Sequence, residues 1–167
     1  MQALIKTLFD IITIRKGPDS IPHSWLLLYA SVLLWFFPLV VASVLVPNFS
    51  GAVVTVVVAS WIMAVMCYAL VVVLAGFRGR LAQALTAIIG CGALIFLAQV
   101  AGIIFLTPFL GVALAQIIIY LLLFWSVYVK GHIIARTIDG EWYMGFLIAI
   151  GVFVLKYAFS EEITPTS

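Results

Sequence analysis

Residues 81–106 read LAQALTAIIGCGALIFLAQVAGIIFL, an uncharged run that is longer than the roughly 20 residues a helix needs to cross a bilayer. Small side chains recur at every fourth position, interrupted only by Leu94. They are Ala82, Thr86, Gly90, Ala98 and Gly102. In lipid, helices associate where small side chains let their backbones approach closely. The run therefore predicts a membrane-spanning helix that is surrounded by others and packs through this ridge.

The composition of the whole chain indicates the same class. Hydrophobic residues make up 66% of the 167 residues and charged residues only 8%, with a mean hydropathy of +1.34. A soluble chain of this size needs more polar residues to cover its surface. The net charge of +2 and the wide spacing of the basic residues argue against nucleic acid as a partner. Expected partners are membrane lipids, other membrane proteins or a second copy of the chain.

The pattern of apolar runs predicts an all-α membrane protein with five transmembrane helices and an N-terminal amphipathic helix at the membrane interface. The five-helix bundle is expected over residues 24–160, with spans at about 25–46, 52–77, 81–106, 108–130 and 142–159. Thr107 and Pro108 are typical of a helix start, so they predict the boundary between the third and fourth spans.

The two ends of the chain are expected on opposite sides of the bundle. Residues 1–23 form a cytoplasmic interfacial segment, and residues 161–167 form a short extracytoplasmic tail. On a helical wheel one side of the N-terminal segment is apolar, with Leu4, Ile5, Leu8, Ile11 and Ile12. This pattern predicts a helix that lies in the membrane plane with its apolar side in the acyl region.

Basic residues are sorted to one side of the predicted bundle. With five spans, the N-terminal segment, the turn at residues 78–80 and residues 130–141 share one side. Seven of the eight basic residues lie there: Lys6, Arg15, Lys16, Arg78, Arg80, Lys130 and Arg136. The positive-inside rule then predicts a cytoplasmic N-terminus and an extracytoplasmic C-terminus in the bacterial cytoplasmic (inner) membrane.

The sequence predicts no ionisable residue at mid-membrane. Proton and cation transporters usually have such a residue. Lys156 is expected near the end of the fifth span, with its stem reaching outward. Gln99 and Gln116 are the deepest polar residues, each about eight residues from a turn at Pro108. They predict either a hydrogen-bonded pair between helices or, together with Thr86 and Ser126, a polar path through the bundle.

A second polar group is expected at the cytoplasmic mouth of the bundle. Its members are Arg78, Arg80, His132, Arg136, Asp139 and Glu141. On a helix His132, Arg136 and Asp139 share one face. This polar cluster indicates either a solvated interface that anchors the helix ends on anionic phospholipid or a site for a polar ligand.

Catalytic and metal-binding signatures are missing from the sequence, which has no HExxH, GxSxG or P-loop motif. Cys67 and Cys91 lie in apolar runs and are expected to act as small packing residues rather than as a redox pair. The two histidines, His23 and His132, are expected at the membrane edge rather than facing each other across a haem. We therefore expect no enzyme activity, no metal and no cofactor.

The layout of the chain resembles that of the Yip1-type membrane proteins. The features that carry the resemblance are the Gly17-Pro18 step in a cytoplasmic N-terminal segment and five closely spaced spans. The chain is also similar to small uncharacterised bacterial inner-membrane proteins that have a GPxxxP lead-in, here Gly17, Pro18 and Pro22, and a Gly-His-Ile step, here residues 131–133, after the fourth span. The Asp-Leu-Tyr-Gly-Pro signature of eukaryotic Yip1 members is absent, so their trafficking role is not carried over. The resemblance implies a non-enzymatic protein that acts through partners or lipids.

Three functions follow from these observations as expectations. The first is an accessory, scaffolding or membrane-organising role through contacts between helices or with lipid. The second is a small transporter or channel subunit with a polar path near Gln99 and Gln116. The third is a membrane enzyme on a lipid-linked substrate, which requires the polar cluster to converge on a pocket.

Overall fold

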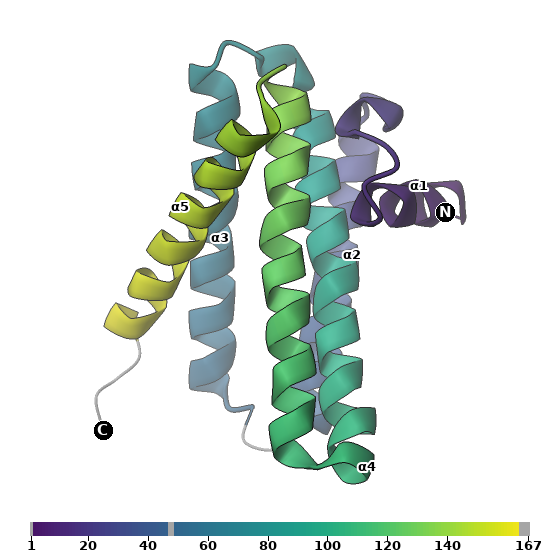
Figure 1. Ribbon diagram of the computed structural model, residues 1–167, viewed down its shortest axis with the longest axis vertical. Helices are drawn as coiled ribbons and strands as arrows, with labels where there is room; N and C mark the ends of the chain where they lie inside the picture. The colour runs from purple at the N-terminus through teal and green to yellow at the C-terminus, as the bar shows by residue number, and fades with distance from the viewer. Residues whose placement is uncertain (1, 47–48, 164–167) are drawn as a thin grey trace.

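The computed structural model describes residues 2–46 and 49–163, and every regular element within these ranges is helical (Figure 1). In chain order the elements are α1 (Gln2–Ile12), η1 (Pro18–Ser20), α2 (Trp25–Leu45), α3 (Gly51–Leu74), η2 (Arg78–Arg80), α4 (Leu81–Thr137) and α5 (Trp142–Ile163). Four helices are long and apolar enough to cross a membrane: α2, α3, α4 together with η2, and α5. The prediction of an all-helical multi-pass membrane protein is thus confirmed in its general form.

Helix α4 folds back on itself at Gly111, where the backbone has φ 76° and ψ 163°. Glycine adopts a positive φ at little cost because it has no Cβ. Figure 1 shows the two resulting arms, residues 81–110 and 112–137, running side by side in opposite directions. The predicted boundary at Thr107 and Pro108 is wrong by a few residues, since Pro108 stays inside the first arm and the turn forms at the glycine.

The second arm of α4 crosses α5 at a contact between two glycines. A Cβ on Gly131 would lie 2.9 Å from the Cα of Phe146, and one on Gly145 would lie 2.7 Å from the Cβ of Ala135 and overlap the carbonyl oxygen of Gly131. The atoms that each added Cβ would meet belong to the backbone or to the Cβ of Ala135, so they cannot move aside. The two helices therefore touch backbone to backbone near the connection that joins them.

Helix α1 lies across the bundle and packs onto the first arm of α4 (Figure 1). Leu8 and Ile11 are 0% exposed, and the thiol of Cys91 donates a hydrogen bond of 3.7 Å to the carbonyl oxygen of Leu8. The methyl groups of Leu8 occupy the space beside Gly90. The expectation that this apolar side enters the acyl region is corrected for Leu8 and Ile11, because protein covers them. Only Ile5 and Phe9 of the helix are large, apolar and exposed.

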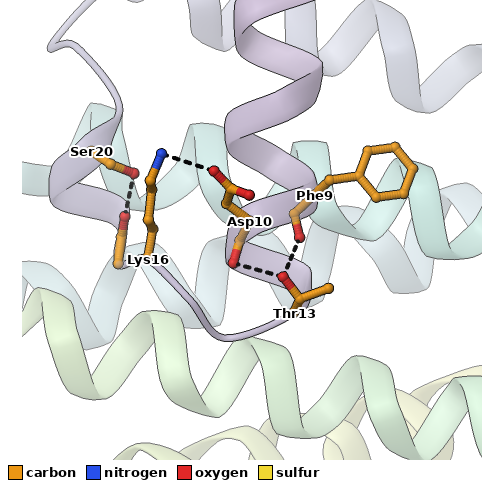
Figure 2. A network of polar contacts seen from close by, with 6 residues as sticks. Phe9, Asp10, Thr13, Lys16 and Ser20 are labelled. Atoms are coloured by element: carbon orange, nitrogen blue, oxygen red, sulfur yellow. Dashed lines mark hydrogen bonds and ion pairs between the residues drawn. The ribbon is translucent and has the colours of Figure 1, made fainter.

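The segment after α1 is fastened by short-range polar contacts (Figure 2). Thr13 donates to the carbonyl oxygens of Phe9 and Asp10, and Lys16 forms an ion pair of 2.8 Å with the carboxylate of Asp10. The hydrogen bond from Lys16 lowers the pKa of Asp10 below its ordinary value. Further along, the amide of Gln83 donates a 2.8 Å hydrogen bond to the carbonyl oxygen of Ile21, which ties this segment to α4.

The predicted ridge of small residues is largely used inside the chain. Ala82, Thr86, Gly90 and Gly102 are buried, whereas Ala98 is exposed. Gly90 faces α1, and Gly102 faces Ile119 of the second arm. The ridge thus brings this chain's own helices together.

The predicted span limits differ from the structure mainly at their ends. Helix α3 ends at Leu74 rather than at residue 77, and α5 continues to Ile163, beyond the predicted end at 159. Residues 161–163 of the predicted tail therefore belong to α5, and residues 164–167 lie outside the described residues. The second arm of α4 continues past the predicted end at 130 to Thr137.

Candidate functional site

A cavity of about 210 Å³ lies between α3, both arms of α4 and α5, with Trp35 of α2 at its wall. Five side chains with hydroxyl, amide or ammonium groups line it: Tyr68, Gln99, Ser126, Lys130 and Lys156. The aromatic lining residues are Trp35, Trp61, Tyr68, Phe96 and Phe153. We refer to this space, with these residues, as the central cavity.

The central cavity arises from the way α5 leaves the second arm of α4. The two helices are in backbone contact at Gly131 and Gly145, and Figure 1 shows α5 leaning away from α4 towards its C-terminal end. Gly92 of the first arm faces the same space, and a Cβ added there would meet no atom within 4 Å. The absence of a side chain at Gly92 and the divergence of α5 together leave the volume open.

Two lysines face the central cavity from different helices. Lys130 lies on the second arm of α4, about 10 Å along the axis from Thr137, and Ser126 is one turn away on the same face. Lys156 lies on α5 and reaches the cavity instead of extending outward as predicted. In the part of the chain that the structure describes, the ion pairs join Lys16 to Asp10 and Arg80 to Asp139, so neither cavity lysine has a carboxylate partner.

Part of the cavity wall is aromatic. The rings of Trp35 and Trp61 are stacked, with centroids 4.1 Å apart and planes 19° from parallel. Phe96 lies 6.1 Å from Trp35 between ring centroids. Such a wall offers flat apolar surface to a ligand ring or chain.

The two predicted intramembrane glutamines are not a pair. Gln99 lines the central cavity, whereas Gln116 is exposed on the second arm. The position of the turn explains why the two amides do not meet. Gly111 lies twelve residues from Gln99 but only five from Gln116, so the amides lie at different distances from the turn along the two arms. Of the predicted polar path, Ser126 also lines the cavity, but Thr86 is buried elsewhere and donates a 2.7 Å hydrogen bond to the carbonyl oxygen of Ala82.

The predicted polar cluster comes together only in part. Arg80 forms a 2.8 Å ion pair with Asp139 and donates a 3.2 Å hydrogen bond to the carbonyl oxygen of Thr137. Arg136 and Arg80 border a groove of about 10 Å³, which has room for a single water molecule. A pocket for a lipid-linked substrate would have to be far larger.

The remaining members of the cluster point elsewhere. His132 is turned to the N-terminal segment, with its Nε2 atom 3.3 Å from the carbonyl oxygen of Lys16. Arg78 and Glu141 are exposed and do not border the groove. The polar contacts of the cluster therefore mainly connect the N-terminal segment and the α4–α5 connection to the bundle, through His132 and Arg80 respectively.

The thiols and histidines have separate partners. Cys91 bonds to Leu8 and Cys67 donates to the sulfur of Met63 at 3.6 Å, and both cysteines are free. His23 packs its ring edge-on against Trp25, far along the chain from His132. Across the residues that the structure describes, no three His, Cys, Asp or Glu side chains are grouped as a metal site requires.

The cavity residues that the sequence reasoning missed are Trp35, Trp61, Tyr68, Lys130 and Lys156. A signal for the lysines was present: Ser126 and Lys130 are four residues apart, and Lys156 is a single charge within an otherwise apolar run. The helical pattern continues beyond Lys130 to Thr137, which places that lysine inside the arm and away from its end. The tryptophans carried no comparable signal, since an aromatic residue within a span is most often a packing residue.

Comparison of the chain with protein-family models, curated proteins and solved structures found no match. The resemblance to Yip1-type proteins stays a prediction, and the function is argued from the site alone.

Proposed function

We propose that the chain crosses the membrane five times, through α2, α3, each arm of α4, and α5. The support is the reversal at Gly111, which divides the 60-residue apolar segment from Arg78 to Thr137 into two lengths, each sufficient to span. In this arrangement α1 lies beside the bundle and does not cross.

The orientation we propose has the N-terminal segment in the cytoplasm and the end of α5 outside. Six basic residues support it, since they lie on α1, the segment after it, η2 and the last turn of the second arm. They are Lys6, Arg15, Lys16, Arg78, Arg80 and Arg136. Lys130 no longer contributes to this count, because it faces the central cavity. A bacterial cytoplasmic membrane is the setting that this charge pattern fits.

The function we propose is binding of a small solute within the membrane, with the chain acting as a carrier or as a subunit of one. The single observation that carries this proposal is the central cavity, where two lysines without a carboxylate partner among the described residues and three hydroxyl or amide groups line one space between four helical segments. Keeping a charged side chain within a membrane protein costs free energy, and such groups usually mark a ligand or ion pathway.

The two other expected functions have less support. A scaffolding role rests on packing residues free for a partner, and most of the small-residue ridge is covered by this chain itself. An enzyme on lipid-linked substrates needs a pocket at the polar cluster, where the groove holds about 10 Å³. The absence of enzyme activity stays a prediction.

A substitution that fills the cavity tests the proposal. Gly92→Phe places a ring in open space inside the cavity, and Gly151→Phe places the same ring on the exposed side of α5, where a Cβ also meets no atom within 4 Å. Each variant is purified in mild detergent, moved into lipid nanodiscs, and examined by native mass spectrometry for small molecules that remain bound. In parallel, each is reconstituted in liposomes and assayed for uptake of a panel of labelled solutes.

We expect a bound small molecule and solute uptake with the wild type and with Gly151→Phe, and neither with Gly92→Phe. Equal behaviour of the two phenylalanine variants would show that the cavity is not where the solute binds. A wild-type protein that carries no small molecule and moves no solute would overturn the proposed function and leave scaffolding as the better account.

A further inference from the structure

We infer that the central cavity takes a small amphipathic anion, with a carboxylate or phosphate group at Lys130 and Lys156 and an apolar body against Trp35 and Trp61. The inference rests on the proposed function and names the chemical class of its solute. Three features of the cavity carry it: its charge, the order of its residues along the helices and its size.

The charge of the lining is positive, and the described residues supply nothing to balance it. Lys130 and Lys156 reach the cavity from α4 and α5, and the described lining residues include no aspartate or glutamate. Tyr68 and Ser126 add hydroxyl donors that suit an oxyanion. An anionic ligand supplies the counter-charge that favours the ammonium form of both lysines, and hydrogen bonds between charged groups are the stronger ones.

Lys130 and the stacked tryptophans lie at different depths along the bundle axis. Measured from the ends of their helices near η2 and the α4–α5 connection, Lys130 lies ~10 Å deep and Trp61 ~20 Å deep at 1.5 Å per residue. Lys156 lies ~21 Å along the leaning helix α5, so its long side chain enters the cavity from a level close to that of Trp61. A ligand that contacts these groups has its charge between the two lysines, on the Lys130 side of the tryptophans, and its apolar part against Trp61.

The size of the cavity limits the apolar part. Its volume of about 210 Å³ can be compared with an engineered apolar cavity of roughly 150 Å³ that holds benzene. The space therefore suits a ring or a short branched chain with one charged group. A phospholipid with two full acyl chains is far larger, although its headgroup has the same oxyanion chemistry.

The test uses the full chain in nanodiscs of zwitterionic phosphatidylcholine and isothermal titration calorimetry with four probes of similar shape. They are naphthoate, naphthyl phosphate, neutral naphthamide and cationic naphthylmethylammonium. We expect both anions to bind at least about ten-fold more tightly than naphthamide, since hydrogen bonds between charged groups are the stronger ones, and the cation not to bind.

Three variants assign the binding to the proposed residues. Lys130→Gln and Lys156→Gln keep donors but remove the charge, so each should weaken naphthoate about ten-fold and leave naphthamide unchanged. Lys6→Gln, on α1 and exposed, is the matched control and should leave all affinities unchanged. Trp61→Leu should weaken naphthoate and naphthamide by the same factor, because it removes apolar surface that both share.

Addition of anionic phosphatidylglycerol to the nanodiscs identifies the natural source of the anion. If phosphatidylglycerol competes with naphthoate for binding, a lipid headgroup is supported as that source. If the affinity for naphthoate stays unchanged, a free solute is supported. Naphthamide binding as tightly as naphthoate, unchanged by either lysine variant, would overturn the inference while the proposed function stands. If none of the probes binds and no small molecule copurifies, the proposed function itself fails.

Discussion

Two sides of one helix, the first arm of α4, differ in how the chain fills the space beside them. On one side Gly90 lies against the methyl groups of Leu8, and the residues around it are buried. On the other side Gly92 faces the central cavity, where a Cβ would meet no atom within 4 Å. Both residues are glycines in the same uncharged run, and the sequence does not distinguish them.

The difference shows that small residues serve two purposes in this bundle. At Gly90, and at the crossing of Gly131 with Gly145, the missing Cβ allows another segment to approach closely, as is usual between helices in lipid. At Gly92 the missing Cβ leaves room in the central cavity. The packed side thus holds the fold together, and the cavity side keeps a space open at some cost in stability.

The largest effect is expected where the packed contacts involve backbone. Gly145→Leu would push a side chain into the nitrogen and Cβ of Ala135, 2.7 Å from where its own Cβ must lie. Overpacking costs about 1–3 kcal/mol when side chains can move, and more where they cannot. We expect the variant to lose its monodisperse peak in fluorescence-detected size-exclusion chromatography.

Gly151→Leu, on the exposed side of the same helix, is the control for the Gly145 variant and should elute like the wild type. A monodisperse Gly145→Leu protein with a wild-type melting temperature would mean that α5 does not cross the second arm at this glycine.

The second prediction compares the two glycines of the first arm directly. Gly90→Leu must displace Leu8, whose methyl carbons lie 2.8 and 2.9 Å from the added Cβ, and should lower the free energy of unfolding by about 3 kcal/mol. Gly92→Leu enters open space and also gains helix propensity, so it should be neutral or stabilise by about 1 kcal/mol. Thermal unfolding in the same detergent measures both. Equal losses for the two variants would remove the distinction between a packed side and a cavity side.

The third prediction concerns a charge on the cavity side. Lys130→Met removes an ammonium group without a carboxylate partner and keeps a flexible side chain of similar length, so we expect it to raise the free energy of unfolding by about 1 kcal/mol. Lys6→Met, an exposed substitution of the same kind, should change it little. A melting temperature lowered by Lys130→Met would indicate that the lysine is held by partners within the bundle.

Much of the fold could be predicted because lipid restricts what a backbone can do. The uncharged runs at residues 25–46, 52–77 and 81–106 required helices, and the structure has helices over nearly all of them. The turn between the arms of α4 was harder to locate. Pro108 and Gly111 both interrupt a helix, and only the local backbone geometry selects the glycine.

The candidate site could be predicted only in fragments. Gln99 and Ser126 were identified from their polarity, and both line the cavity. Lys130 and Lys156 were expected at the membrane edges, because the end of a span is where a lysine is usually found. Their meeting depends on the angle at which α5 leaves α4 beside the contact of Gly131 with Gly145. Gly131 directly follows Lys130, but Lys156 comes from the other helix. A pattern along one helix does not contain such an angle.

The smallest effect is expected at the exposed rim of the packed side, where Lys16 pairs with Asp10 (Figure 2). The hydrogen bond from Lys16 lowers the pKa of Asp10, so the pair stabilises the folded chain at every pH above the ordinary aspartate value. The contribution is lost as the pH falls through the lowered pKa of the folded state, because the carboxyl group is then protonated. Lys16→Met should therefore lower the melting temperature slightly at about pH 6 and have a smaller effect at about pH 2. Asp10→Asn should show the same pH dependence relative to the wild type, and an equal effect of Lys16→Met at both pH values would mean that the lysine stabilises α1 through its alkyl stem rather than through Asp10.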